Sequence, residues 1–122
     1  MSLKVYQYPQ CSTCRKALKW LDARKLEYVA LDITQTPPSK QELTAMLAHY
    51  EGDLRRLFNT SGQVYRDLGI KDKLATMTKT AAIDLLSAHG KLIKRPFLLA
   101  GDQGRVGFKE DEWAAALDGE ER

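Results

Sequence analysis

Tyr8-Pro9-Gln10-Cys11-Ser12-Thr13-Cys14-Arg15-Lys16 contains both cysteines of this 122-residue chain. Before this stretch, apolar side chains alternate in the manner of a strand. After it, Ala17, Leu18 and Leu21 recur at the spacing of one helix face. The stretch therefore predicts a strand, a loop with a Cys-x-x-Cys pair, and a helix that begins at the cysteines.

The first turn of a helix favours a thiolate over a thiol. Its backbone N–H groups have no partner within the helix, and it forms the positive end of the helix dipole. Such settings lower a cysteine pKa from about 8.5 to roughly 3.5–7.5, and Arg15 and Lys16 add positive charge nearby. We therefore predict Cys11 as the nucleophile and Cys14, one helical turn later, as the thiol that resolves a disulfide formed on Cys11.

The cysteine pair is also compatible with two roles outside redox chemistry. Free cysteines are often small buried apolar residues, and a Cys-x-x-Cys pair can be half of a zinc site. A zinc site needs about four ligands, and the chain adds only His49 and His89, which are far apart in sequence. The strand–Cys-x-x-Cys–helix context favours redox chemistry, and we predict no metal site.

Length and composition suit a single domain, residues 1–122, that is large enough to bury a core of its own. Two cysteines are too few for a disulfide scaffold, so we expect a reducing compartment, the cytoplasm, and no membrane segment. The 19 basic and 16 acidic residues give a net charge of +3. This mild charge suits an anionic small molecule or an acidic protein patch and does not indicate nucleic acid; we expect a monomer.

The first part of the chain has the pattern of a βαβ unit. Strands are expected over residues 3–8 and 28–33, with a helix over about 14–24 between them. Two strands joined by a crossover helix predict parallel pairing and a right-handed connection.

The middle of the chain is helical. Ser39 and Glu42 match a capping box at the start of an amphipathic helix, which Gly52 ends. Short helices are expected over 53–58, 65–70 and 71–75, a turn over 59–62, and a further helix over about 80–89 with Gly90 at its C-terminal cap.

The last part has the pattern of a hairpin followed by a helix. A strand is expected over 91–100, a turn over 101–104, a returning strand over 105–108, and a helix that begins at Glu110 and runs through Trp113 to Leu117, with a frayed tail over 119–122. The whole order is that of an α/β thioredoxin-like (glutaredoxin-like) fold. We predict a mixed four-stranded sheet with a helical subdomain inserted at about 38–90.

Four motifs give this sequence a family resemblance. They are YPQCSTCRKA at 8–17, LFNTSG at 57–62, LIKRPF at 92–97 and VGFKEDEW at 106–113. In this order and spacing they resemble the arsenate reductase/Spx family of bacterial thioredoxin-fold proteins over essentially the whole chain.

The resemblance implies roles for particular residues. Cys11 attacks an oxyanion or forms a mixed disulfide, Arg95 holds the anion, and the bond before Pro96 is cis. A guanidinium fork complements two oxygens of a tetrahedral anion at once, so the assignment of Arg95 is physically coherent. The predicted site has Cys11, Cys14 and Arg95 as catalytic residues and Ser12, Thr13, Arg15, Asn59 and Pro96 as substrate-binding residues.

The chain also departs from the glutaredoxin-coupled arsenate reductases, which have one cysteine in this loop and three arginines around it. Asn59 and the neighbourhood of Phe108 stand where two of those arginines are expected; the candidates to replace them are Arg105 and either Arg55 or Arg56. The second cysteine, Cys14, is instead the pattern of the Spx/MgsR-like subgroup. In Spx proteins this pair is a disulfide switch on a regulator that binds the C-terminal domain of the RNA polymerase α subunit, and Gly52 falls near a glycine of that contact surface.

Three functions therefore compete. The first is a thiol-dependent oxidoreductase of the arsenate reductase type, with no bound cofactor and with glutathione, glutaredoxin or thioredoxin as electron donor. The second is an Spx-type redox-switch regulator whose partner is the RNA polymerase α subunit. The third is a generic glutathione or disulfide oxidoreductase, which needs only Cys11, Cys14 and Pro96.

Overall fold

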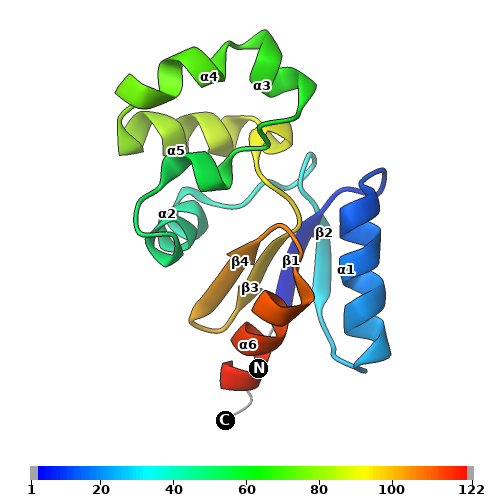
Figure 1. Cartoon of the computed structure of the whole chain (residues 1–122). Coiled ribbons are helices and arrows are strands. Elements are labelled where there is room, and N and C mark those ends of the chain that lie inside the picture. The colour runs from blue at the N-terminus through cyan, green and yellow to red at the C-terminus, as the bar shows by residue number, and fades with distance from the viewer. Residues whose placement is uncertain (1–2, 121–122) are drawn as a thin grey trace. The chain divides into compact units, whose positions relative to one another are not determined.

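The computed structural model describes residues 3–120 of the chain. They form two compact units. One comprises the residues up to Asp32 together with those from Arg95 onward, and the other is the middle segment Ile33–Lys94. The first unit contains the sheet, and the second contains no strand among its elements but most of the helices (Figure 1).

The first unit is built on a four-stranded sheet with the strand order β2-β1-β3-β4. Its strands are β1 (Leu3–Gln7), β2 (Val29–Asp32), β3 (Phe97–Ala100) and β4 (Gln103–Val106). β1 pairs with β2 in parallel and with β3 antiparallel, and β3 pairs with β4 antiparallel. The predicted mixed four-stranded sheet and the parallel βαβ unit are thus confirmed.

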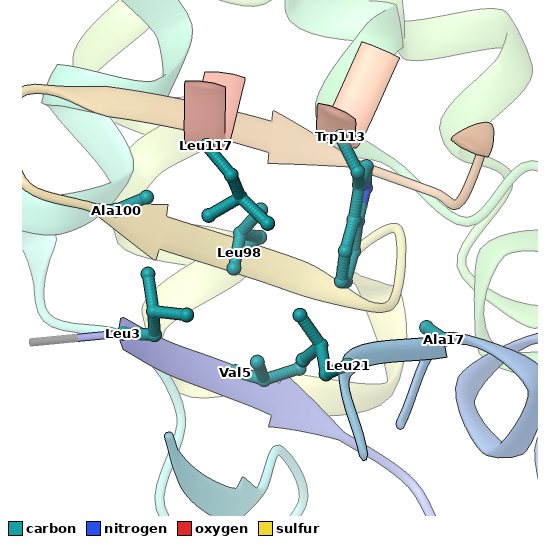
Figure 2. Close-up of a cluster of buried hydrophobic side chains, with 8 residues drawn as sticks. All are labelled: Leu3, Val5, Ala17, Leu21, Leu98, Ala100, Trp113 and Leu117. Atoms are coloured by element: carbon teal, nitrogen blue, oxygen red, sulfur yellow. The ribbon is translucent and has the colours of Figure 1, made fainter. Parts of the chain in front are cut away.

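Two helices cover one face of this sheet, namely α1 (Ser12–Ala23) and α6 (Glu110–Glu120). Figure 2 shows the cluster that joins them to the strands, with Trp113 and Leu117 of α6 pointing toward Leu98 of β3. Trp113 is fully buried, and its indole N–H donates a hydrogen bond of 3.0 Å to the Gly107 carbonyl. The large indole ring is thereby packed in the core, and its one polar group has a hydrogen-bond partner.

The hairpin differs from its predicted boundaries. The strand begins only at Phe97; before it, Gly90–Leu92 form the short 3-10 helix η3, and Ile93 pairs with Phe58 in an isolated antiparallel bridge. The turn is two residues long, since Ala100 pairs directly with Gln103. Gly101 has φ +63, the conformation that a two-residue hairpin turn requires. Residues 103 and 104 therefore belong to the returning strand, which ends at Val106.

The second unit consists of short helices. They are α2 (Lys40–His49), η1 (Leu54–Leu57), α3 (Gln63–Asp67), α4 (Ile70–Lys73), η2 (Leu74–Thr76), α5 (Lys79–Ala88) and η3. The predicted capping box at the start of α2 is confirmed: the Glu42 N–H donates to Ser39 Oγ at 3.1 Å, and the Ser39 N–H donates to Glu42 Oε1 at 2.9 Å. Gly52, with φ +81, donates its N–H to the Leu47 carbonyl and ends this segment as predicted.

The prediction that Gly90 is the C-terminal cap of α5 is wrong. α5 ends at Ala88, His89 is its C-cap, and Gly90 is not among the residues with positive φ. A Cβ at position 90 would instead collide with the carbonyl oxygen of Ile33. Glycine is required there because a neighbouring backbone passes too close for any side chain.

Within residues 3–120, the helices are too short or too polar for any of them to cross a membrane.

Candidate active site

The cysteine loop is shaped by its own backbone. β1 ends at Gln7, and the Tyr8 carbonyl accepts the Cys11 N–H at 3.0 Å, which closes a tight turn around Pro9. Cys11 then has extended backbone angles (φ −91, ψ 113) and is the N-cap of α1. The Cys14 N–H donates to Cys11 Sγ at 3.3 Å. The thiol thus takes the place of the serine or aspartate oxygen that usually caps a helix, and α1 begins at Ser12, two residues earlier than predicted.

Cys11 is held as the more acidic thiol. Partial burial raises its pKa, but hydrogen bonds from Cys14 and Arg95 and the positive charge of Arg95 outweigh burial and lower the pKa below its ordinary value. Hydrogen bonds and an opposite charge stabilise a thiolate directly. Since the thiolate is the reactive form, Cys11 is the better nucleophile of the pair.

Cys14 has the opposite character. It is completely buried, and the pKa of its thiol is raised to about 12, chiefly by burial. The hydrogen bond to Cys11 and the negative charge on that sulfur contribute to this rise, while the Tyr8 backbone and Arg95 oppose it. Cys14 therefore stays protonated and donates its S–H to the Cys11 sulfur. Both cysteines are free thiols in the structure.

Arg95 reaches the loop through the strand register. β1 and β3 are antiparallel, with Tyr6 opposite Phe97, so the residues before Phe97 lie beside those that follow Tyr6. The Arg95 guanidinium carbon lies over the Tyr8 ring, 4.9 Å from its centroid. The Arg95–Pro96 peptide bond is cis, as the family resemblance implies. The Pro96 carbonyl accepts the Gly107 N–H at 2.9 Å, which ties this segment to the end of the hairpin.

The other predicted substrate-binding residues differ in their surroundings. Ser12 and Thr13 are exposed in the first turn of α1, directly after Cys11. Arg15 is also exposed, and its Nη1 donates to the Pro9 carbonyl at 2.8 Å. Arg15 therefore stabilises the loop through its backbone. The cation that lowers the pKa of Cys11 is Arg95.

Asn59 belongs to the second unit. Its N–H donates to the Leu92 carbonyl at 2.7 Å, and its side-chain oxygen accepts a hydrogen bond from the Ser61 hydroxyl. It begins the predicted polar turn, which the Gly62 N–H closes by donating to the Asn59 carbonyl. Its role in substrate binding stays a prediction.

The position near Phe108, where the family resemblance leads one to expect an arginine, is part of an aromatic cluster. The Phe108 ring meets Trp113 and Trp20 edge to face, with centroid distances of 5.0 and 5.8 Å. Arg105, a candidate replacement, donates its Nη1 to the adjacent Gly104 carbonyl at 2.7 Å.

Tyr8 is the site residue to which the sequence pattern assigns no role beyond the end of a strand. Its backbone nevertheless holds Cys11, and its ring lies against Arg95. The sole sequence signal is an aromatic residue directly before the loop proline. The contact with Arg95 depends on the pairing of β1 with β3, which one short sequence window does not contain.

No three His, Cys, Asp or Glu side chains within residues 3–120 are grouped so that they could hold a metal ion.

Comparison with known proteins places this geometry in context. The model of the ArsC family matches residues 6–116. The uncharacterized protein YusI of Bacillus subtilis (strain 168) is 47% identical over 113 residues, which are 93% of this chain and 96% of that protein. The global transcriptional regulator Spx of Streptococcus agalactiae serotype V is 30% identical over 116 residues, 94% of this chain and 82% of that protein. A crystal structure described as a possible arsenate reductase from Streptococcus mutans UA159 matches with a TM-score of 0.84 and 39% identity, over 91% of this chain and 96% of that one.

Proposed function

The chain belongs to the ArsC family, and on that premise we propose that it is a thiol-dependent oxidoreductase of the arsenate reductase type, with Cys11 as nucleophile. The observation that carries the proposal is the contrast between the two cysteines. Cys11 is partly exposed, and its pKa is lowered by Cys14 and Arg95, whereas Cys14 is buried and protonated. A reactive thiolate beside a protonated second thiol is the arrangement that a two-step thiol reduction needs.

The chemistry begins with an anion held at the start of α1. The Arg95 guanidinium and the N–H groups of the first helical turn both favour negative charge there. The Cys11 thiolate attacks the arsenic of arsenate; an As–S bond forms and an As–O bond breaks, and that oxygen leaves as water after it is protonated. Arg95 offsets the charge that develops on the remaining oxygens.

The second step transfers electrons. A second thiol, either Cys14 or glutathione, loses its proton and attacks Cys11 Sγ. An S–S bond forms, the As–S bond breaks, and its electron pair reduces As(V) to As(III). The resulting disulfide then takes two electrons from glutathione, glutaredoxin or thioredoxin, which we propose as donors.

The proposal is tested by steady-state arsenate reduction, with glutathione plus glutaredoxin and separately with thioredoxin. We expect Cys11→Ser to abolish turnover and Arg95→Ala to lower kcat/KM, and Cys14→Ser shows whether that thiol resolves the intermediate. Arg24→Ala is the matched control, because Arg24 also lies over an aromatic ring, 4.6 Å from the Trp20 centroid, at the other end of α1. A folded protein with a reactive Cys11 and no turnover with either donor overturns the arsenate assignment.

Two observations favour a second function, a redox-switch regulator of the Spx type. Spx of Streptococcus agalactiae is a relative at 30% identity, and this chain has the Cys-x-x-Cys pair of the Spx-like pattern. In this alternative the Cys11–Cys14 disulfide is the switch, and the partner is the C-terminal domain of the RNA polymerase α subunit. Gly52 is open to solvent on its Cβ side, with no atom within 4 Å of an added Cβ.

Pull-down with the purified RNA polymerase α C-terminal domain, under oxidising and reducing conditions, tests the second function. Capture that differs between the two redox states supports the regulator, and no capture in either redox state contradicts it. The third function, a generic disulfide oxidoreductase, is tested by adding a small disulfide as the substrate in the reductase assay. Turnover of the disulfide without turnover of arsenate supports that function.

A further inference from the structure

We propose that Tyr8 is a positioning residue, whose ring holds the guanidinium of Arg95 beside the sulfur of Cys11. The inference rests on the proposed function in one respect, since it concerns the same nucleophile and the same cation. The Tyr8 side chain itself takes no part in bond making or breaking.

The contact between Tyr8 and Arg95 does not itself require a hydrogen-bond donor of the guanidinium. The Arg95 guanidinium carbon lies over the ring at 4.9 Å from the centroid, within the range of a cation–π contact. Arginine stacks on aromatic faces, and its N–H donors lie in the plane of the guanidinium. The Tyr8 ring can therefore hold the guanidinium in place without competing for the hydrogen bonds that it donates to Cys11 or to an anion.

Tyr8 is itself anchored to the cysteine loop. Its carbonyl accepts the Cys11 N–H at 3.0 Å, and its hydroxyl donates to Gln10 Oε1 at 3.3 Å. The same residue is thus joined to Cys11 through its backbone and to Arg95 through its ring. The nucleophile and the cation are therefore both in contact with one residue.

The groups that act on Cys11 show why this arrangement matters. They are the Cys14 thiol and backbone N–H from α1 and the Arg95 guanidinium from the segment before β3. Arg15, the nearest arginine in sequence, directs its Nη1 to the Pro9 carbonyl. A displaced Arg95 therefore has no evident substitute at the sulfur among the described residues.

The test compares two alkylating reagents that attack the same thiolate. Iodoacetate carries a negative charge and iodoacetamide does not; with both, Cys11 Sγ bonds to the CH2 carbon and iodide leaves. Both rates are proportional to the fraction of Cys11 in the thiolate form, so their ratio does not depend on that fraction. The ratio depends instead on the positive charge beside the sulfur, which attracts only the charged reagent. Because the Cys14 pKa is raised to about 12, labelling at neutral pH falls on Cys11, which mass spectrometry verifies.

Four variants define the expected pattern. Arg95→Ala lowers the iodoacetate/iodoacetamide ratio, and Tyr8→Leu lowers it roughly two- to fivefold, the range that corresponds to a partly exposed cation–π contact. Tyr8→Phe keeps the ring, so its ratio should stay close to that of the wild type. The matched control is Tyr50→Leu, which removes a similar pair in the second unit, where Arg56 lies 4.5 Å from the Tyr50 ring centroid, and leaves the ratio unchanged.

A double variant makes the assignment specific. In an Arg95→Ala background, Tyr8→Leu should have no further effect on the ratio, because the residue through which it acts is gone. An unchanged ratio in Tyr8→Leu, or an equal loss in the presence and absence of Arg95, overturns the positioning role. A lowered ratio in a protein that reduces no arsenate supports the positioning role and counts against the proposed function alone. Circular dichroism of each variant, with Tyr8→Phe as the milder change, separates a positioning effect from loss of folding.

Discussion

The thiol of Cys11 is partly exposed at the start of α1, whereas the thiol of Cys14 is buried one turn further along. Both residues are cysteines in the first turn of one helix, so their opposite acid–base properties come from their surroundings. Burial dominates at Cys14, and hydrogen bonds together with the charge of Arg95 dominate at Cys11. The pair thus separates into a nucleophile and a proton-bearing partner.

This separation predicts a pH dependence. Arg95→Ala removes a stabilising charge from the Cys11 thiolate, so its pKa should rise and alkylation should require higher pH. We expect the midpoint of the iodoacetamide rate-versus-pH curve to move upward by about one pH unit, the low end of the effect of a neighbouring opposite charge. Cys14→Ala, which removes a donor, should move it in the same direction. A midpoint that stays in place in both variants, or moves in Arg24→Ala, contradicts these assigned causes of the lowered pKa.

At the scale of the element, the capping of α1 connects stability with chemistry. Cys11 Sγ accepts the Cys14 N–H, so the nucleophile is also the N-cap of the helix. Cys11→Ser keeps an acceptor at this position, and Cys11→Ala removes it. We expect Cys11→Ala to have a free energy of unfolding about 1 kcal/mol below that of Cys11→Ser, measured by urea titration. Equal stabilities of the two variants would mean that the sulfur does not act as a cap.

Elements of the chain that depend on local pattern were predicted well, and those that depend on distant neighbours were not. The capping box of Ser39 and Glu42 is a short-range motif, and it forms as expected. Gly90 has the sequence context of a helix cap, but its requirement for glycine comes from Ile33, which lies far away in the chain. In the same way the loop indicated the nucleophile, whereas the contact of Tyr8 with Arg95 required the register of two strands.

The close approach at Gly90 predicts a large loss of stability for the smallest substitution. In Gly90→Ala the added Cβ meets backbone rather than a flexible side chain, so the second unit has to shift. We expect the free energy of unfolding to fall by about 1–3 kcal/mol, as in overpacked cores. Ser61→Ala, at an exposed turn of the same unit, is the control and should change little. A Gly90→Ala protein as stable as the wild type would show that the two segments separate at little cost.

At the scale of the whole molecule, the chain folds into two units, and all the residues that act on Cys11 belong to the one that contains the sheet. The two ends of the chain build that unit, with the helical segment between them. The alternating and helical patterns predicted each half, and the order of the elements indicated that the halves belong to one thioredoxin-like sheet. The pairing of β1 with β3 is where these halves meet.

The cluster around Trp113 therefore supports the sheet on which the cysteine loop is built, and its loss should be visible at the buried thiol. Trp113→Ala vacates a fully buried site and should lower the free energy of unfolding by about 3–5 kcal/mol. Since Cys14 is fully buried in the folded protein, we expect its labelling to report the opening of this unit. We expect Cys14 to become labelled at lower urea concentration in Trp113→Ala than in the wild type, with Trp113→Phe between them. If Cys14 remained protected to the same urea concentration in all three proteins, the cluster would not be what keeps the cysteine loop closed.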